Sequence, residues 1–167
     1  MNRWLRYVQF LEIRMYGYLS IMKAVIQRVS KARVAIAGYS SQTISKGAVI
    51  LLGIAEDDTI EDIPVLANKI LNLRLFPKNK KMDLSIKDIS GDLLIISQFT
   101  LYADCSKGNR PSFIKAAKSV HAKKIYTEFV NYMYNQNLVI KTGIFGKMMQ
   151  VSLVNDGPVT IILDTKI

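Results

Sequence analysis

The chain has 167 residues, half of them hydrophobic, and its 23 Lys and Arg against 13 Asp and Glu give a formal net charge of +10. This length predicts one domain with one sizeable core, and the charge favours a polyanionic partner without identifying it. The single cysteine, Cys105, excludes an internal disulfide framework and is typical of the reducing cytoplasm. The sequence has no apolar run long enough to cross a membrane as a helix, so we expect a soluble protein with no membrane contact.

The first 21 residues, Met1–Ile21, do not have the pattern of a core strand, because Arg and aromatic side chains are scattered along them. Glu12 and Arg14 interrupt the apolar stretch, which argues against a secretory signal. An amphipathic organelle-targeting peptide is one alternative. We favour a dispensable extension or an upstream start codon, and we therefore predict that the folded domain spans residues 22–167.

Short apolar runs dominate the next part of the chain and predict strands. The first two are expected at residues 24–29 and 32–37, separated by a short polar link, and a third at residues 48–54. The stretch 44–54 is mostly apolar, which suits a strand that is buried on both faces.

A helix is expected to begin at Thr59. Thr59 and Asp62 have the spacing of a capping box, and Pro64 falls in the first turn, where proline is tolerated. Pro77 is expected to end this element, and residues 78–81 to form a solvated basic turn. The apolar side chains lie on one helical stripe formed by Ile63, Leu66, Ala67, Ile70 and Leu71.

A second helix is expected after a buried strand at residues 92–96 and a possible helical turn at residues 113–118. Ser119 can cap this helix, and residues 135–137 close it. Its apolar positions recur every four residues, at Ile125, Phe129 and Met133. Three further strands are expected at residues 138–141, 149–154 and 159–163. Strands interleaved with two helices indicate a mixed α/β domain.

Two strand ends carry polar residues where a ligand can reach them. Ser97, Gln98 and Thr100 follow the apolar run 92–96, and Asn155 and a Gly-Pro step follow the run 149–154. On pattern alone, a strand capped by polar residues and an ordinary Gly-Pro turn are the favoured explanations, and only the two stretches together shift the balance toward a ligand site.

Taken together, the two stretches resemble the D-aminoacyl-tRNA deacylases, also called D-tyrosyl-tRNA deacylases. The signatures of that family are a Ser-Gln-Phe-Thr-Leu block, here residues 97–101, and an Asn-x-Gly-Pro-x-Thr block, here residues 155–160. The resemblance begins at Met22 and reaches about Thr165, and it departs at Lys147, where a small residue such as Ala is expected. It also takes in residues 22–29, 73–76, 107–113 and 143–146.

The resemblance implies a fold and an activity. The fold is a mixed α/β domain of largely antiparallel sheets in a layered, barrel-like sandwich, with two main helices on one side. The activity is hydrolysis of the ester bond of D-aminoacyl-tRNA, with glycine mischarged on tRNA as a further candidate substrate. Catalysis is implied for Ser97, Gln98, Phe99 and Thr100. It rests mainly on positioning of the substrate, assisted by the 2′-hydroxyl of the terminal adenosine and by backbone N–H donors near Phe99 and Thr100.

The role of Thr100 has two readings, nucleophile and substrate-orienting residue. Because no base neighbours it in the sequence, we favour orientation. The resemblance further implies that Gly157 and Pro158, joined by a cis bond and accompanied by Asn155, enter the active site of the opposite subunit of a homodimer. Their carbonyls would hold the α-ammonium group of the substrate, so that the side chain of an L-amino acid collides with the protein.

Other chemistries have weaker support. His121 is the only histidine and fits a solvated helix position, while Asp57 and Asp58 fit a helix start, so no metal site and no cofactor are expected. A thiol-dependent reaction at Cys105 is a minor alternative. A non-catalytic RNA-binding protein is the main rival, because Lys107 and Arg110 near the first signature suit contacts with tRNA phosphates.

Overall fold

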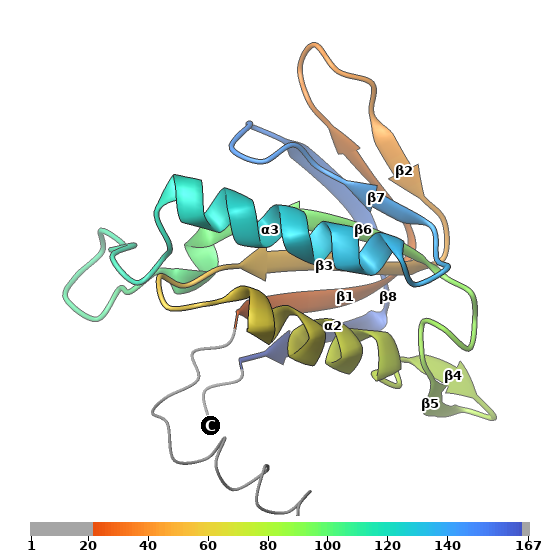
Figure 1. Ribbon diagram of the computed structural model, residues 1–167. Coiled ribbons are helices and arrows are strands. Elements are labelled where there is room, and N and C mark those ends of the chain that lie inside the picture. The colour runs from red at the N-terminus through yellow and green to blue at the C-terminus, as the bar shows by residue number, and fades with distance from the viewer. Residues whose placement is uncertain (1–21, 165–167) are drawn as a thin grey trace, which may run out of the picture.

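The structure is a computed structural model that describes residues 22–164, and its main feature is a strongly curved six-stranded sheet (Figure 1). The sheet has the order β2-β1-β3-β6-β7, and β8 pairs with β1. The pairs β3–β6 and β6–β7 are parallel and the others are antiparallel. The strands are β1 (Lys23–Ala35), β2 (Gln42–Ile44), β3 (Gly47–Gly53), β6 (Asp92–Ser97), β7 (Ile140–Thr142) and β8 (Gln150–Leu163).

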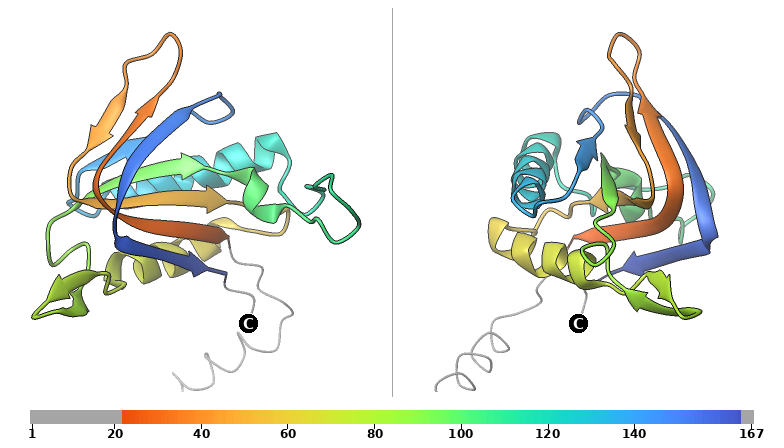
Figure 2. Two further views of the ribbon diagram at one scale, coloured as in Figure 1. Left: turned by 180° about the vertical axis from the view of Figure 1, so that it is seen from behind. Right: turned by 90° about the vertical axis from the view of Figure 1, so that its right-hand side faces the viewer.

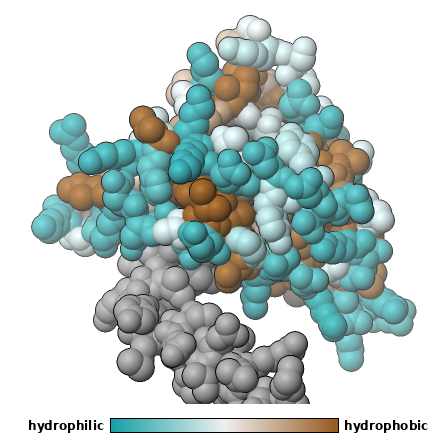
Figure 3. Space-filling view, viewed as in Figure 1, coloured by the Kyte–Doolittle hydropathy of each residue, from teal (hydrophilic) through white to brown (hydrophobic). Residues whose placement is uncertain are grey.

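Two α-helices, α2 (Ile63–Asn72) and α3 (Ser119–Tyr134), lie side by side on one side of the sheet (Figure 2). The face that carries them is covered mostly by hydrophilic side chains (Figure 3). A small hairpin of β4 (Phe76–Lys78) and β5 (Lys81–Leu84) follows α2. This arrangement confirms the predicted class, a mixed α/β fold with a barrel-like sheet and two helices on one side.

The two faces of the sheet bury separate apolar clusters. Ala24 and Ile26 of β1 belong to the larger cluster, which lies against the two helices, whereas Ala32 and Val34 belong to the smaller one. The register between β1 and β8 shifts twice between Gln27 and Lys31, which is the signature of a β-bulge. Because an extra residue reverses the alternation of side chains, one strand supplies both clusters.

The same irregularities explain two wrong boundaries. Residues 24–29 and 32–37 were predicted as two strands, but β1 continues without a break across the exposed pair Ser30 and Lys31 and ends at Ala35. Residues 149–154 and 159–163 likewise belong to the single strand β8. In both cases the polar or Gly-Pro residues bulge out of the ladder and pairing resumes beyond them.

The start of the first helix agrees with the prediction. The Asp62 carboxylate accepts hydrogen bonds from the Thr59 backbone N–H at 2.8 Å and from the Thr59 hydroxyl at 2.9 Å, and a short 3-10 turn, η1 (Ile60–Asp62), leads into α2. The whole predicted stripe is buried. The helix ends at Asn72, however, well before Pro77, which lies in β4. Residues 78–81 form the predicted turn, with positive φ at Asn79 and Lys80.

The second helix begins and ends close to the expected places. Ile125, Phe129 and Met133 are buried as predicted, and the helix ends at Tyr134. Its N-cap is Lys118, so Ser119 is the first helical residue and makes no capping hydrogen bond. Residues 113–118 form a single turn and not a helix, because Ala116 bridges to Ala55 instead.

Within residues 22–164, none of the helices combines the length and the apolar composition that a membrane crossing requires. The predicted extension, Met1–Ile21, lies outside the described residues.

Candidate active site

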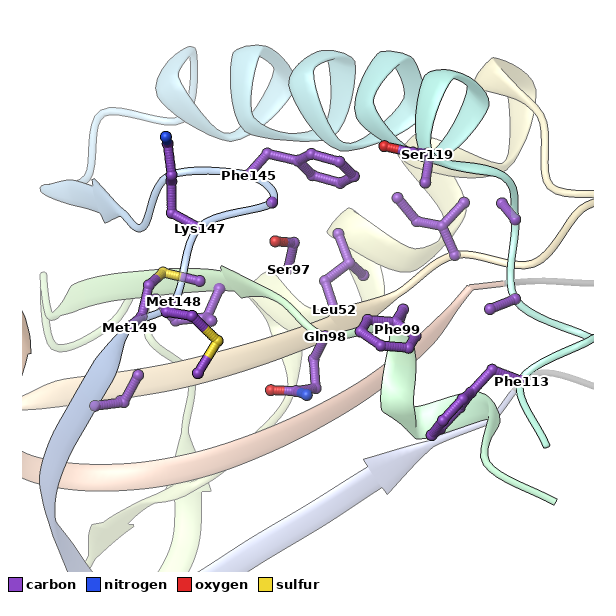
Figure 4. Close-up of a pocket in the computed structure, with 17 residues that line it drawn as sticks. Leu52, Ser97, Gln98, Phe99, Phe113, Ser119, Phe145, Lys147, Met148 and Met149 are labelled. Atoms are coloured by element: carbon purple, nitrogen blue, oxygen red, sulfur yellow. The ribbon is translucent and has the colours of Figure 1, made fainter. Parts of the chain in front are cut away.

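The first signature opens onto a cavity of about 620 Å³ (Figure 4). The parallel strands β3 and β6 end beside one another here, since Leu52 is paired with Ser97. The N-terminal turn of α3 forms a second wall, and the segment that joins β7 to β8 forms a third. The wall is mostly apolar, with Phe99, Phe113, Phe145, Met148 and Met149 among its larger side chains.

Ser97 and Gln98 are set by the end of the β-ladder. The Gln98 backbone N–H donates to the Leu52 carbonyl at 2.7 Å, which continues the pairing of β3 and β6 by one residue. Because side chains alternate along a strand, the two point in opposite directions. Figure 4 shows the Ser97 hydroxyl in the middle of the cavity and the Gln98 amide turned away from it.

The chain then turns into a short 3-10 helix, η2 (Phe99–Tyr102), at the cavity rim. The Phe99 side chain is 57% exposed and contacts Phe113 edge-on, with 5.0 Å between the ring centroids. As the first residues of a helix, Phe99 and Thr100 carry backbone N–H groups that the helix leaves without an internal acceptor. This rim therefore offers an exposed aromatic ring and two donors beside the cavity.

Thr100 lies beside the cavity but does not line it. Its hydroxyl oxygen accepts a hydrogen bond from the Gln98 side-chain amide at 2.5 Å. That contact orients the amide, and no basic side chain is hydrogen-bonded to the hydroxyl among the described residues.

Lys107 and Arg110 lie on an exposed loop next to the rim. The backbones of Asp104 and Ser112 join the two ends of this loop through two hydrogen bonds, at 2.8 and 2.9 Å, so the loop has the form of a hairpin. Phe113, the next residue, lines the cavity. The two cations thus lie on a loop that projects from the cavity rim, together with Cys105, whose thiol is free and exposed.

The second signature forms a bulge on β8. In the pairing with β1, Thr160 lies opposite Gln27 and Asn155 opposite Val29, so residues 156–159 loop out of the ladder. Asn155 closes the bulge, because its side-chain oxygen accepts from the Val159 N–H at 3.0 Å and its amide donates to the Thr160 hydroxyl at 2.9 Å.

Gly157 and Pro158 are exposed at the tip of this bulge, and the peptide bond between them is cis. Gly157 has φ of +127°, a conformation that favours glycine. A Cβ atom at this position would also lie 2.7 Å from Nη2 of Arg28. Only glycine therefore fits here without rearrangement.

Arg28, opposite the bulge, holds it in place. Its side chain is almost fully buried, and Nε donates to the Asp156 carbonyl at 2.9 Å while Nη1 donates to the Leu75 carbonyl at 2.6 Å. The Asp156 carboxylate lies 3.3 Å from the same Nε. One guanidinium thus ties the bulge to the segment that follows α2.

The cavity and the bulge are separate features of one chain. Gly157, Pro158 and Asn155 are absent from the residues that line the cavity, whereas Ser97, Gln98 and Phe99 line it. Lys147, the residue that departs from the family pattern, also lines it. The two signatures are therefore not brought together within a single chain.

The acidic turn after β3 differs from its prediction. Asp58 does not support a helix start: it is buried, and Oδ2 accepts from the Ala55 N–H at 2.6 Å, closing the turn. Burial raises the pKa of the Asp58 carboxyl to about 7, and its Oδ1 has no partner. His121 is not a solvated residue either, since it is partly buried with Nε2 2.8 Å from the Asp58 carbonyl oxygen.

No three His, Cys, Asp or Glu side chains gather into a possible metal site anywhere between residues 22 and 164.

Some site residues received no role from the sequence. Phe145 and Met149 become cavity walls only because the fold returns the chain from β7 to the ends of β3 and β6. Arg28 did carry a signal: with Ala24 and Ile26 it occupies alternate positions of one strand, which places a charge on a buried face.

Comparisons with known proteins agree with the signatures. The sequence profile of the family described as "D-Tyr-tRNA(Tyr) deacylase" matches residues 25–164. A D-aminoacyl-tRNA deacylase of Thermosipho africanus is 57% identical over 146 residues, which cover 87% of this chain and 98% of the relative. One of Desulfatibacillum aliphaticivorans is 51% identical over 146 residues, 87% of this chain and the whole of the relative.

Two solved structures have the same fold. One, titled "c-Myc DNA Unwinding Element Binding Protein", is 39% identical with a TM-score of 0.80 and covers 86% of this chain and 98% of its own. The other, titled "Structural Analysis of a probable eukaryotic D-amino acid tRNA deacylase", has a TM-score of 0.75 with the same coverage. Its identity of 15% makes it similar in fold alone.

Proposed function

Because this chain belongs to the D-Tyr-tRNA(Tyr) deacylase family and is a hydrolase, we propose that it cleaves the ester bond between a D-amino acid and the 3′ end of tRNA. The products are the free amino acid and free tRNA. The proposal is supported chiefly by the polar end of β6, Ser97 and Gln98, which opens onto a largely apolar cavity beside a basic loop. Such a cavity suits an aminoacylated nucleoside, and such a loop suits phosphates.

An aminoacyl ester is already an activated acyl group, so the site needs to position it more than to attack it. Water adds to the ester carbonyl, and the backbone N–H groups of Phe99 and Thr100 stabilise the oxyanion that forms. The bond to the ribose oxygen then breaks, that oxygen takes a proton, and the neighbouring 2′-hydroxyl assists the transfer. The Ser97 hydroxyl holds the substrate in this geometry, and Gln98, whose amide is turned away from the cavity, fixes Thr100 at the rim.

Thr100 acts as an orienting residue in this scheme, because its hydroxyl holds the Gln98 amide. Thr100→Val removes the acceptor while keeping the shape of the side chain, and Thr100→Ser restores it. We expect kcat/KM to fall about tenfold in Thr100→Val, the loss of roughly one hydrogen bond, and to recover in Thr100→Ser. A loss of several orders of magnitude in Thr100→Val, together with an acyl-enzyme trapped on the hydroxyl of residue 100 in the wild type or in Thr100→Ser, would make Thr100 the nucleophile.

Selection against L-amino acids is assigned to the bulge on β8. The carbonyls of Gly157 and its neighbours would hold the α-ammonium group, so that an L side chain collides with the protein while a D side chain points outward. Glycine carries no side chain and escapes this filter, which makes glycine mischarged on tRNA a second candidate substrate. Asn155 closes the bulge and so positions those carbonyls.

The separation of the bulge from the cavity supports a homodimer in which each chain completes the other's site. Mixing two inactive variants tests this. Gly157→Ala distorts the bulge, because φ is +127° and the added Cβ meets Arg28, and Ser97→Phe fills the cavity. A heterodimer of the two contains one intact cavity facing one intact bulge.

We expect such heterodimers to regain about half of the wild-type activity per dimer. Heterodimers that are verified by mass but remain inactive would refute the shared site.

The rival function, a non-catalytic RNA-binding protein, predicts that the wild-type chain binds tRNA through residues such as Lys107 and Arg110 without turnover. Replacing Cys105 with Ala should leave turnover unchanged, whereas a thiol-dependent enzyme would lose its activity. We place the reaction in the cytoplasm, where aminoacyl-tRNA is used.

A further inference from the structure

A second hollow, of about 520 Å³, has no role in the mechanism above. It is formed by the turn between β1 and β2, by the C-terminal end of α3, and by β7 with the residues that follow it. Tyr39 comes from the turn, Tyr134 from the helix end, and Lys141 and Thr142 from β7. Two stretches far apart in the sequence, residues 36–42 and 134–144, thus converge on it.

Its side chains have the chemistry of a base-binding platform. The two tyrosines keep 54% and 52% of their surface exposed, so both rings are open to a ligand. Proteins bind unpaired RNA bases by stacking them on such rings, with a nearby cation for the phosphate. Lys141 supplies that cation, and none of the residues that line the hollow is acidic.

The position of the hollow fits a polynucleotide that leaves the reaction cavity. Ile144 lines the hollow and Phe145, the next residue, lines the cavity, so one segment of chain takes part in the walls of both. Lys147, on the same segment, is exposed at the cavity wall. In Figure 4 its ammonium group points away from Ser97 and toward the outside of the cavity. A strand that passes over the segment would therefore meet a positive charge between the two sites.

We infer that the hollow between Tyr39 and Tyr134 binds an unpaired nucleotide of the tRNA acceptor end, one that precedes the terminal adenosine, by stacking its base and pairing its phosphate with Lys141. This rests on the proposed function, because it takes the terminal adenosine to occupy the reaction cavity. It adds a second contact that only a polynucleotide substrate can make. The lysine at position 147 then bridges the two sites by attracting the phosphate between them.

Two substrates separate this subsite from the reaction site. D-Tyrosyl-tRNA reaches both sites, whereas D-tyrosyl adenosine, an ester without phosphates, reaches only the cavity. Alanine in place of Tyr39 or Tyr134 should lower kcat/KM for the tRNA about 5- to 100-fold, mainly through KM, in keeping with the loss of one stacked base. Activity on the adenosine ester should not change. Tyr39→Phe and Tyr134→Phe keep the rings and should restore tRNA activity.

A direct readout does not depend on turnover. Uncharged tRNA with 2-aminopurine in its unpaired 3′ segment should lose fluorescence on binding, and the Tyr→Ala variants should abolish that quenching. The inference would be overturned if the Tyr→Ala variants lost kcat/KM equally on the tRNA and on the adenosine ester. It would also be overturned if these variants kept full activity on both substrates and still quenched the 2-aminopurine fluorescence. The latter result would leave the hollow to a ligand other than tRNA. If the wild-type chain hydrolyses neither substrate, the proposed function fails, while the quenching experiment still decides whether the hollow binds tRNA.

Discussion

Arg28 ties the bulge that carries Gly157 to the rest of the domain, so its removal tests whether that bulge belongs to the active site. We consider Arg28→Met, which keeps a long side chain in the same space and removes every donor. The guanidinium donates to two carbonyl oxygens, those of Asp156 and Leu75, and is 8% exposed. Both oxygens lose a charged donor, and the ion pair with Asp156 is lost as well.

The expected cost follows from these contacts. A hydrogen bond from a charged group contributes about 1.5 to 3 kcal/mol. The ion pair adds little, because the Asp156 side chain is 45% exposed. We therefore expect the free energy of unfolding to fall by about 3 to 6 kcal/mol, out of a total of about 5 to 15 kcal/mol for a typical domain. The bulge, no longer held, should also shift.

The assay has two parts, urea unfolding at a fixed protein concentration and hydrolysis of D-aminoacyl-tRNA at a temperature where the variant stays folded. We expect kcat/KM to fall at least tenfold in the folded variant. Arg33→Met is the matched control, because Arg33 lies on the same strand and is exposed. A folded Arg28→Met protein with full activity would show that the bulge takes no part in the reaction. If Arg28→Met lost no more stability than Arg33→Met, the hydrogen bonds of Arg28 would not be what holds the bulge in place.

Three further predictions concern charge and the ends of the chain. In the native state the Asp58 carboxyl keeps its proton up to a pKa of about 7, whereas in the unfolded state it loses the proton near its ordinary pKa of 3.8. The free energy of unfolding should therefore decline by about 4 kcal/mol as the pH rises between these two values. Asp58→Asn should flatten this decline in urea titrations, and Asp57→Asn, at an exposed site, should not. Replacing Lys107 or Arg110 with Ala should reduce the slope of log tRNA affinity against log salt by about one, and an unchanged slope would place that residue away from phosphates. Deleting Met1–Ile21 should leave the melting temperature and deacylation unchanged, and a large drop in melting temperature would show that these residues pack on the domain.

The helices were predictable because their signals are local. The contact between Thr59 and Asp62 spans one turn, and the buried stripes of both helices recur at helical spacing, so the residues that decide these elements are close in the sequence. The end of α2 was missed because nothing at Asn72 breaks the pattern as strongly as Pro77 does.

The long strands and the site were less predictable because they depend on distant residues. Ser30 and Lys31, like Gly157 and Pro158, look like chain breaks, yet the ladder between β1 and β8 resumes beyond each of them. The signatures located the rim of the cavity but not its far wall, which needs Phe145 to return from β7. Arg28 could have been noticed as a charge on an apolar face, but its partner carbonyls become visible only in the folded chain.

The most direct measurement is hydrolysis of one tRNA charged in parallel with D- and L-tyrosine, by the purified full chain at equal substrate concentration. We predict rapid release of D-tyrosine and no release of L-tyrosine above the spontaneous rate. A protein that binds both tRNAs and hydrolyses neither, or that hydrolyses both at the same rate, would contradict the proposal of a deacylase with chiral selection at this site.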